Sequence, residues 1–131
     1  MLTQSLGSSI ADAAMTVVSG GPLLVENGRV NVRTAEEQMA PDIARGRAPR
    51  TAIGLKQDGT LLMLVVDGRS SASAGMTLAE LAQYFVKLGA VSAVNYDGGG
   101  SSEMVINGKI VNKPSDGRER LVSIGLGLFI K

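Results

Sequence analysis

Two aspartates, each followed by glycine, are the residues best placed for chemistry. Asp67 follows the apolar run of residues 61–66, and Asp97 follows the apolar segment of residues 90–96. If both segments are parallel strands, both carboxylates lie at the sheet edge where open α/β sheets bind ligands. If the two strands are also neighbours, about 4.8 Å apart, the carboxylates would lie roughly 5 to 10 Å apart, the range of the paired carboxylates that hydrolyse glycosides. The alternative is that each aspartate only accepts backbone hydrogen bonds in its own turn.

A run of glycine and serine follows Asp97 and comprises Gly98, Gly99, Gly100, Ser101 and Ser102. Because glycine adopts positive φ without strain, successive amides of such a run can point into one concavity and bind an oxyanion. The run lacks the lysine and the spacing of a Walker loop, so a tight turn is the alternative interpretation. The chain has no histidine to activate a serine nucleophile, and we therefore interpret Ser101 and Ser102 as hydrogen-bond donors.

Arginine presents a planar fork that matches phosphate oxygens. Four arginines are candidates for this role: Arg50, Arg69, Arg118 and Arg120. Arg69 follows Asp67 by two residues, which places it at the same predicted edge as the glycine run. For Arg50 and Arg120, a surface or interdomain ion pair is the alternative. For Arg118 and its neighbour Glu119, a surface ion pair is the favoured interpretation.

The composition narrows the chemistry further. Thirteen basic and twelve acidic residues give a formal net charge of +1, so no overall field attracts nucleic acid or an anionic membrane. The absence of cysteine and histidine argues against disulfides, zinc sites and Ser-His-Asp catalysis, and leaves carboxylates as the main acid–base groups. No apolar run reaches the 18 or so residues of a membrane span, and the first residues lack a signal-peptide pattern. We expect neither nucleic-acid binding nor membrane insertion, and the composition leaves the compartment undetermined.

Short turn signals and apolar patterns predict the elements that position these residues. Three dipeptides predict tight hairpins: Asn27-Gly28, Asp58-Gly59 and Asn107-Gly108. Their flanking strands are expected at residues 22–26 with 29–32, 51–56 with 60–66, and 104–106 with 109–111. Residues 34–47 are polar without a clear period and are expected to form a surface loop or a short helix. A further long strand is expected at residues 121–130, where small and apolar residues alternate.

The most clearly marked helix spans residues 77–88, where apolar residues recur on one helical face. Thr77 and Glu80 form a capping box at its start, and Gly89 ends it. We therefore assign Glu80 to helix capping rather than to catalysis. A second, short helix is expected after Ser9.

The strand at residues 61–66, the helix and the strand at residues 90–96 together predict a βαβ crossover. Such a crossover is right-handed by default and makes its two strands parallel. We expect one domain over residues 1–131, long enough to bury about two thirds of its unfolded-state surface. The predicted class is α/β, or mixed α+β, with a mixed sheet, one parallel βαβ crossover, several β-hairpins and two or three helices.

Several stretches of the chain form an ordered set of motifs. They are Arg50-Thr51-Ala52-Ile53-Gly54, Asp67-Gly68-Arg69, Ser73-Ala74-Gly75-Met76-Thr77-Leu78, Asn95-Tyr96-Asp97-Gly98-Gly99-Gly100-Ser101-Ser102, Asn112-Lys113-Pro114-Ser115 and Glu119-Arg120. In this order and spacing they closely resemble the phosphodiester glycosidase domain family. The resemblance runs from about residue 20 to the end of the chain.

This resemblance implies hydrolysis of a sugar from a sugar-1-phosphodiester, on substrates that include exopolysaccharide or cell-envelope glycans. It implies that Asp67 and Asp97 are catalytic, as nucleophile or base and as oxocarbenium stabiliser. The residues implied to bind the sugar phosphate are Arg50, Thr51, Arg69, Gly98, Gly99, Gly100, Ser101, Ser102 and Arg120. No cofactor and no metal site are expected, and a divalent cation held by the same carboxylates is an alternative. An envelope or extracellular location is suggested by the family alone.

The family domain usually begins upstream, with an Asn-Gly-Gly-Phe-Phe-like segment that this chain lacks. We therefore expect the chain to be the C-terminal part of such a domain, and a second chain or a homo-oligomer to complete the sheet and site. The alternative function is a non-catalytic polysaccharide-binding or assembly module with the same fold. Tyr96 stands where the family typically has leucine, so an additional contact is expected there.

Overall fold

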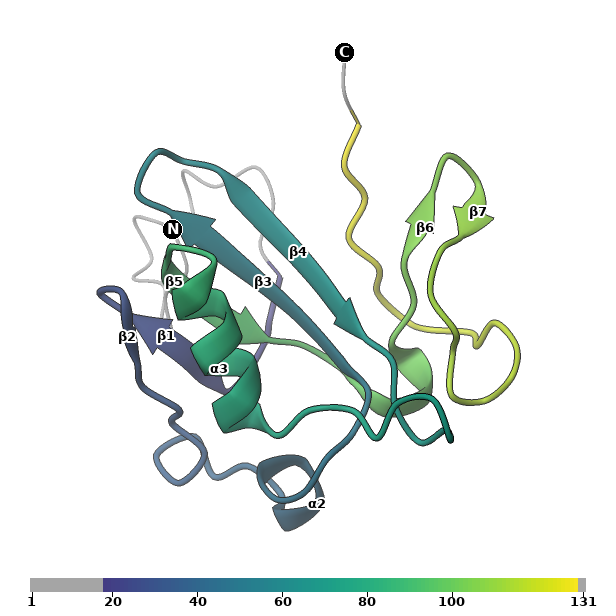
Figure 1. The fold of residues 1–131 in the computed structure, drawn as a ribbon, viewed down its shortest axis with the longest axis horizontal. Coiled ribbons are helices and arrows are strands. Elements are labelled where there is room, and N and C mark those ends of the chain that lie inside the picture. Colours follow the sequence, from purple (N-terminus) through teal and green to yellow (C-terminus); the bar gives the residue numbers. More distant parts are fainter. Residues whose placement is uncertain (1–17, 130–131) are drawn as a thin grey trace.

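Figure 1 shows the computed structural model, which describes residues 18–129. The helix expected after Ser9 lies outside these residues. The elements are β1 (Leu23–Glu26), β2 (Arg29–Val30), α2 (Pro41–Ala44), β3 (Arg50–Lys56), β4 (Leu61–Val66), α3 (Leu78–Lys87), β5 (Ala90–Asn95), the 3-10 helix η1 (Gly99–Ser101), β6 (Val105–Ile106) and β7 (Lys109–Ile110). Helix α3 lies across one face of a sheet, and the hairpin β6–β7 stands apart from that sheet (Figure 1).

The main sheet has five strands in the order β2-β1-β5-β3-β4, and its neighbouring strands are antiparallel. The predicted parallel βαβ crossover between neighbouring strands is therefore not shown, because every hydrogen-bonded pair of strands in this sheet is antiparallel. Strand β3 lies between β4 and β5, because it first forms a hairpin with β4, and the α3 connection then carries the chain across β3 to its other side. The apolar pattern indicated both strands but not their neighbours. Since both are antiparallel to β3, β4 and β5 still run in the same direction and end at the same edge.

Helix α3 begins and ends as its sequence predicts. Thr77 Oγ1 accepts a hydrogen bond from Glu80 N at 3.2 Å, and Glu80 Oε2 accepts one from Thr77 N at 2.9 Å. The capping role of Glu80 is thus confirmed. Gly89 follows the helix with a φ of +84°, a conformation that favours glycine at a helix end.

The core lies between α3 and the sheet. It is built from buried apolar side chains on both layers: Leu24, Val25, Ala52, Leu78, Leu81, Ala82, Phe85, Ala90 and Ala93. Gly54 in β3 lies directly under the Phe85 ring, where a Cβ atom would stand 2.6 Å from Phe85 Cδ1. Glycine at this strand position therefore lets the helix pack closely on the sheet.

The turns largely follow the prediction. Asn27-Gly28 and Asn107-Gly108 have positive φ at both residues and join β1 to β2 and β6 to β7. Gly59, with a φ of +86°, lies in a longer connection in which Lys56 N donates to Thr60 O at 3.0 Å. Residues 34–47 contain the short helix α2, one of the two forms expected for this segment.

The strand expected at residues 121–130 is not formed within residues 121–129, which the structure describes. This segment is extended away from the sheet, and its apolar side chains are exposed, with Phe129 92% exposed. The alternation of small and apolar residues indicates a capacity for pairing, but a strand needs a partner. Within the described part of the chain, no strand pairs with this segment.

Candidate functional site

The loop after β5 is the point where three other segments of the chain converge. A Cβ atom at Gly98 would lie 2.8 Å from Pro49 O, and one at Gly99 would lie 3.3 Å from Arg69 Nη1. A Cβ atom at Gly100 would collide with the Asp116 carboxylate. The three glycines therefore allow close packing of segments that precede β3, follow β4 and follow β7.

The loop uses several of its amides to hold its own shape. Gly99 N donates to Pro49 O at 3.0 Å, Ser101 N to Gly98 O at 3.2 Å, and Ser102 N to Gly99 O at 3.2 Å. These bonds make a tight turn, the alternative interpretation of the glycine run. An oxyanion bound to the loop would have to use its other amides or displace these bonds.

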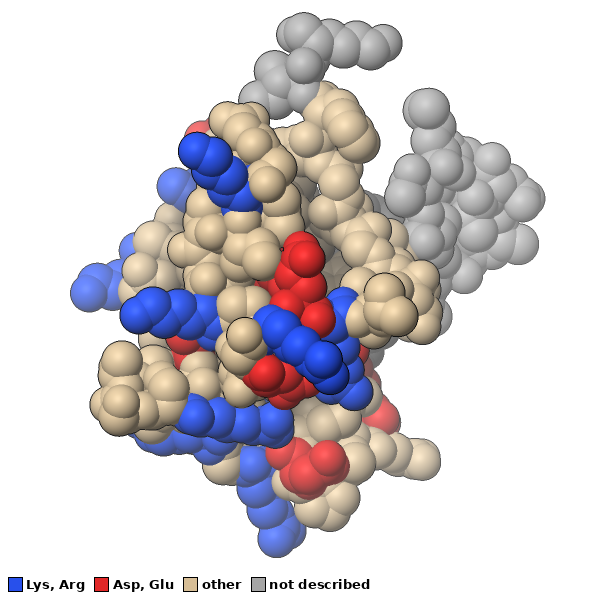
Figure 2. Space-filling view, turned by 90° about the vertical axis from the view of Figure 1, so that its right-hand side faces the viewer, with Lys and Arg blue, Asp and Glu red and all other residues tan. Residues whose placement is uncertain are grey.

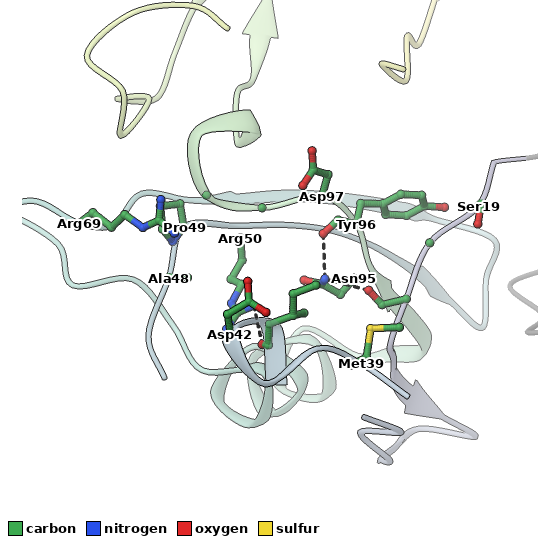
Figure 3. Close-up of a pocket in the computed structure, with 15 residues that line it drawn as sticks. Ser19, Met39, Asp42, Ala48, Pro49, Arg50, Arg69, Asn95, Tyr96 and Asp97 are labelled. Carbon is green, nitrogen blue, oxygen red and sulfur yellow. Dashed lines mark hydrogen bonds between the residues drawn. The ribbon is translucent and has the colours of Figure 1, made fainter. Parts of the chain in front are cut away.

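A cavity of about 510 Å³ opens beside this loop (Figure 3). Its walls come from residues 19–21, from Met39 with Asp42 and Ile43 in and beside α2, from residues 48–50, from Arg69 and from residues 95–99. Of the predicted site residues, five line it: Arg50, Arg69, Asp97, Gly98 and Gly99. The other predicted site residues are not part of its lining: Thr51, Asp67, Gly100, Ser101, Ser102 and Arg120.

Arg50 fastens the cavity wall to the sheet. The side chain is buried, with 3% of its surface exposed. Its Nε donates to Met76 O at 3.0 Å, its Nη1 to Ile43 O at 3.2 Å and its Nη2 to Gly46 O at 3.1 Å. Burial, and to a lesser extent the positive charge of Arg69, lowers the pKa of Arg50 below its ordinary value. Each guanidinium nitrogen is thus committed to a backbone carbonyl, although Arg50 belongs to the lining of the cavity.

Arg69 is the more available arginine. It is exposed, has a φ of +55°, and its guanidinium lies against Gly99. Within residues 18–129, no carboxylate pairs with it. Its fork of donors is therefore free to meet an anion at the mouth of the cavity.

The two aspartates are held very differently. Asp67 Oδ1 accepts hydrogen bonds from Asn112 Nδ2 at 3.0 Å and from Lys113 N at 2.9 Å, so it ties the end of β4 to the chain beyond β7. Asp97 is exposed, and among the described residues no hydrogen bond holds its carboxylate. In Figure 3 that carboxylate points away from Asp42 and Arg50. The two aspartates share the sheet edge, but β3 separates the strands that carry them.

Asn112 connects Asp67 to the glycine-serine loop. Besides its bond to Asp67, Asn112 Nδ2 donates to Ser102 O at 3.0 Å, and Asn112 Oδ1 accepts from Met104 N at 2.8 Å. Thr51 Oγ1 donates to Ser102 Oγ at 3.3 Å. Thr51 and the buried Ser102 thus belong to an internal network that fixes the loop. Asn112 belongs to the motif of residues 112–115, but its spacing along the chain did not indicate these partners.

Arg120 is in a surface ion pair, the alternative considered for it. Its Nη1 is 3.8 Å from Asp116 Oδ2, and Asp116 packs on Gly100. Figure 2 shows basic and acidic side chains lying next to one another on one face of the molecule. The face therefore has no large region of one charge, and attraction of a charged ligand falls to local groups.

Asn95 and Tyr96 line the cavity. Neither was predicted to have a catalytic or binding role, although an additional contact was expected at Tyr96. Asn95 is 3% exposed, and its Nδ2 donates to Gly21 O at 3.0 Å and to Tyr96 O at 2.8 Å. Tyr96 points toward Ser19 (Figure 3), and burial raises the pKa of its hydroxyl above the ordinary value. Their position immediately before Asp97 was the available signal.

The described residues place limits on metal and membrane sites. No cluster of three or more potential ligands that could hold a metal ion occurs within residues 18–129. Over the same residues, no helix has the length and apolar composition needed to cross a bilayer.

Parts of several known proteins are similar in sequence to this chain. N-acetylglucosamine-1-phosphodiester alpha-N-acetylglucosaminidase of Homo sapiens is 32% identical over 109 residues, which are 76% of this chain and 21% of the human protein. The SPbeta prophage-derived uncharacterized protein YomE of Bacillus subtilis (strain 168) is 43% identical over 90 residues, which are 69% of this chain and 14% of that protein. The chain thus spans only a small part of the length of these curated relatives.

A solved structure is similar as well. The catalytic domain of the zebrafish N-acetylglucosamine-1-phosphodiester alpha-N-acetylglucosaminidase, auto-inhibited by its pro-peptide, matches with a TM-score of 0.65 and 29% identity, over 75% of this chain and 34% of that one. The sequence model of the phosphodiester glycosidases matches residues 2–129, almost the whole chain. Because the match covers almost the whole chain, the chain belongs to the phosphodiester glycosidase family.

Proposed function

We propose that the chain is part of a hydrolase that cleaves a sugar from a sugar-1-phosphodiester. One observation carries the proposal: Arg69, unpaired within residues 18–129, and Asp97, whose carboxylate is free of hydrogen bonds there, both line the cavity beside the glycine loop. The substrate class is supported by the relatives that are named for N-acetylglucosamine-1-phosphodiester. Exopolysaccharide or envelope glycans are the proposed natural sources of such bonds.

The proposed reaction breaks the bond between the anomeric carbon and the phosphodiester oxygen, and water supplies the hydroxyl of the free sugar. Phosphate is a good leaving group, so this site needs less general-acid catalysis and more charge stabilisation than an ordinary glycosidase. Arg69 supplies a fork for the departing phosphate. Arg50 adds positive charge from the buried wall while its nitrogens stay bonded to carbonyls.

Asp97 is the proposed catalytic carboxylate, acting as nucleophile or base or as a stabiliser of the positive charge that develops on the sugar. An exposed carboxylate at the cavity can approach the anomeric carbon without first breaking protein contacts. For Asp67, the bonds from Asn112 and Lys113 support a role in organising the loop, beside the catalytic role that the family resemblance implies.

The test is incubation of the protein with an N-acetylglucosamine-1-phosphodiester, with detection of both the free sugar and the phosphomonoester. Inorganic phosphate should also raise the melting temperature by mass action. Arg69→Lys should show a smaller shift, because lysine cannot make a bidentate contact. Arg29→Lys, at an exposed position in β2, is the matched control. A wild-type protein that releases no sugar and gains no stability from phosphate would reject the proposal.

A non-catalytic glycan-binding or assembly module is the second candidate. It is favoured by residues 121–129, whose exposed apolar side chains suit coverage by another chain or a second copy. Sedimentation analysis over a range of concentrations tests it. A protein that stays monomeric and still turns over the phosphodiester would reject this alternative.

A further inference from the structure

The cavity has two chemically different ends (Figure 3). Arg69 lies at one end against Gly99, and the charged Arg50 lines the wall nearby. At the other end Tyr96 points toward Ser19, near Met39 and Asn95, and in this view the carboxylates of Asp42 and Asp97 lie between the two ends. The cationic end suits phosphate, which leaves the uncharged end for a neutral part of the substrate.

Asn95 brings an unpaired acceptor to the uncharged end. Both hydrogen bonds of its Nδ2 go to backbone carbonyls, those of Gly21 and Tyr96. Its Oδ1 is buried and has no hydrogen-bond partner within the described residues. Buried acceptors in folded proteins are nearly always paired. An unpaired acceptor on a residue that lines a cavity therefore suggests that a ligand supplies the donor. Because Oδ1 is covered, a ligand can bond to it only after neighbouring side chains shift, a change that is common on binding.

Tyr96 supplies an aromatic face beside this acceptor. A Cβ atom at Gly20 would lie 2.9 Å from Tyr96 Cε1, so glycine at this position lets the ring lie along the wall. Within residues 18–129, no hydrogen bond engages the phenol hydroxyl, which is free to donate or accept. A flat apolar ring with a polar tip is suited to a ligand that has both apolar and hydroxylated surface.

We propose that the Asn95 and Tyr96 end of the cavity is the subsite for the sugar, a neutral pyranose, held so that its phosphate reaches Arg69. Asn95 Oδ1 accepts a hydrogen bond from a sugar hydroxyl or amide N–H. Tyr96 covers one face of the ring and bonds a second polar group. The cavity, at about 510 Å³, falls within the range of small-molecule sites. This assignment rests on the proposed function, because it divides the substrate of that reaction between the two ends.

The test measures the binding of two probes to two variants, and NMR titration gives each dissociation constant. The probes are inorganic phosphate and the methyl glycoside of N-acetylglucosamine. Tyr96→Ala should weaken glycoside binding by about tenfold or more and leave phosphate binding within about twofold. Arg69→Lys should do the reverse. Tyr84→Ala is the matched control, since Tyr84 is the chain's other tyrosine and is exposed on α3.

The Asn95 acceptor is tested through the ligand, because any substitution of Asn95 also removes the bonds that shape the wall. Deoxy analogues of the glycoside are compared on the wild-type protein. Loss of the group that bonds Oδ1 should weaken binding by about fivefold or more, whereas the other deoxy analogues should change it less.

Two results would overturn the subsite: no glycoside binding by the wild-type protein, or equal glycoside binding by the wild-type and Tyr96→Ala proteins. Neither result depends on turnover. A protein that binds the glycoside through Tyr96 but does not hydrolyse the phosphodiester would leave the subsite standing and reject only the proposed reaction.

Discussion

Asp67 and Asp97 differ in how firmly their carboxylates are held, although both precede glycine after a strand. Asp67 Oδ1 accepts two hydrogen bonds, whereas Asp97 is exposed and unrestrained within the described residues. The sequence indicated that both lie at one edge, because apolar runs reveal where strands end. It did not indicate the partner Asn112, which lies 45 residues from Asp67 and is brought there only by the fold.

Asp67 offers a test of its organising role. Asp67→Asn keeps an oxygen that can accept both hydrogen bonds, and Asp67→Ala removes it. We expect Asp67→Ala to lower the free energy of unfolding by about 1 to 3 kcal/mol and Asp67→Asn to lower it by less than about 1 kcal/mol. Urea denaturation measures both. Equal losses would show that the charge of Asp67, and not its hydrogen bonding, holds the contact.

At the scale of elements, Asn112 joins the hairpin β6–β7 to the loop beside the cavity. Its Nδ2 faces two acceptors, Asp67 Oδ1 and Ser102 O, and its Oδ1 faces one donor, Met104 N. Only an amide meets this arrangement of two acceptors and one donor. The hairpin is otherwise separate from the main sheet, so this side chain is one of the contacts that set its position.

This arrangement predicts that the isosteric substitution is the more damaging one. Asn112→Asp places an oxygen against both acceptors, while Asn112→Ala only removes the contacts. We expect Asn112→Asp to lower the melting temperature more than Asn112→Ala does. Asn107→Asp, the same chemical change in the turn of the same hairpin, is the control and should have little effect. Thermal unfolding measures the melting temperatures of the three variants. A smaller decrease for Asn112→Asp than for Asn112→Ala would contradict the proposed hydrogen bonds.

The capping box of α3 predicts a dependence on pH. The hydrogen bond from Thr77 N to Glu80, together with smaller effects of Thr77 Oγ1 and Arg47, lowers the pKa of Glu80 below its ordinary value. A lowered folded-state pKa stabilises the protein above the unfolded-state pKa, and this stabilisation is lost as pH falls through the folded-state value. Wild type should thus be slightly more stable than Glu80→Gln at pH 7, and the difference should vanish in acid.

Melting temperatures between pH 7 and pH 2 measure this difference. Glu36→Gln, at an exposed position, is the control, and turnover of Glu80→Gln at pH 7 should stay near that of the wild type. A gap between wild type and Glu80→Gln that persists at low pH would refute the electrostatic origin of the effect.

At the scale of the whole molecule, the sequence predicted the local elements well but did not predict the order of the strands. The turns at Gly28 and Gly108, the helix α3 and its cap all follow from contacts a few residues apart. The expected parallel crossover did not give neighbouring parallel strands because β3 lies between β4 and β5, an arrangement set by long-range packing that apolar runs do not encode. The cavity wall contributed by α2 was missed because the hydrogen bonds from Arg50 to Ile43 O and Gly46 O, which hold it in place, leave no mark in the apolar pattern.

The measurement that bears most directly on the proposed reaction is the turnover of Asp97→Asn on an N-acetylglucosamine-1-phosphodiester. Asparagine preserves the size of the side chain and suits the turn, and the stability of the variant should change little, because no hydrogen bond holds this carboxylate within residues 18–129. If Asp97 acts in the transition state, kcat should fall about a hundredfold or more, equivalent to about 2.7 kcal/mol, with KM changed far less. Asp58→Asn, in an exposed turn, should remain active. A folded Asp97→Asn protein that keeps more than about a third of wild-type turnover would contradict the catalytic role of Asp97.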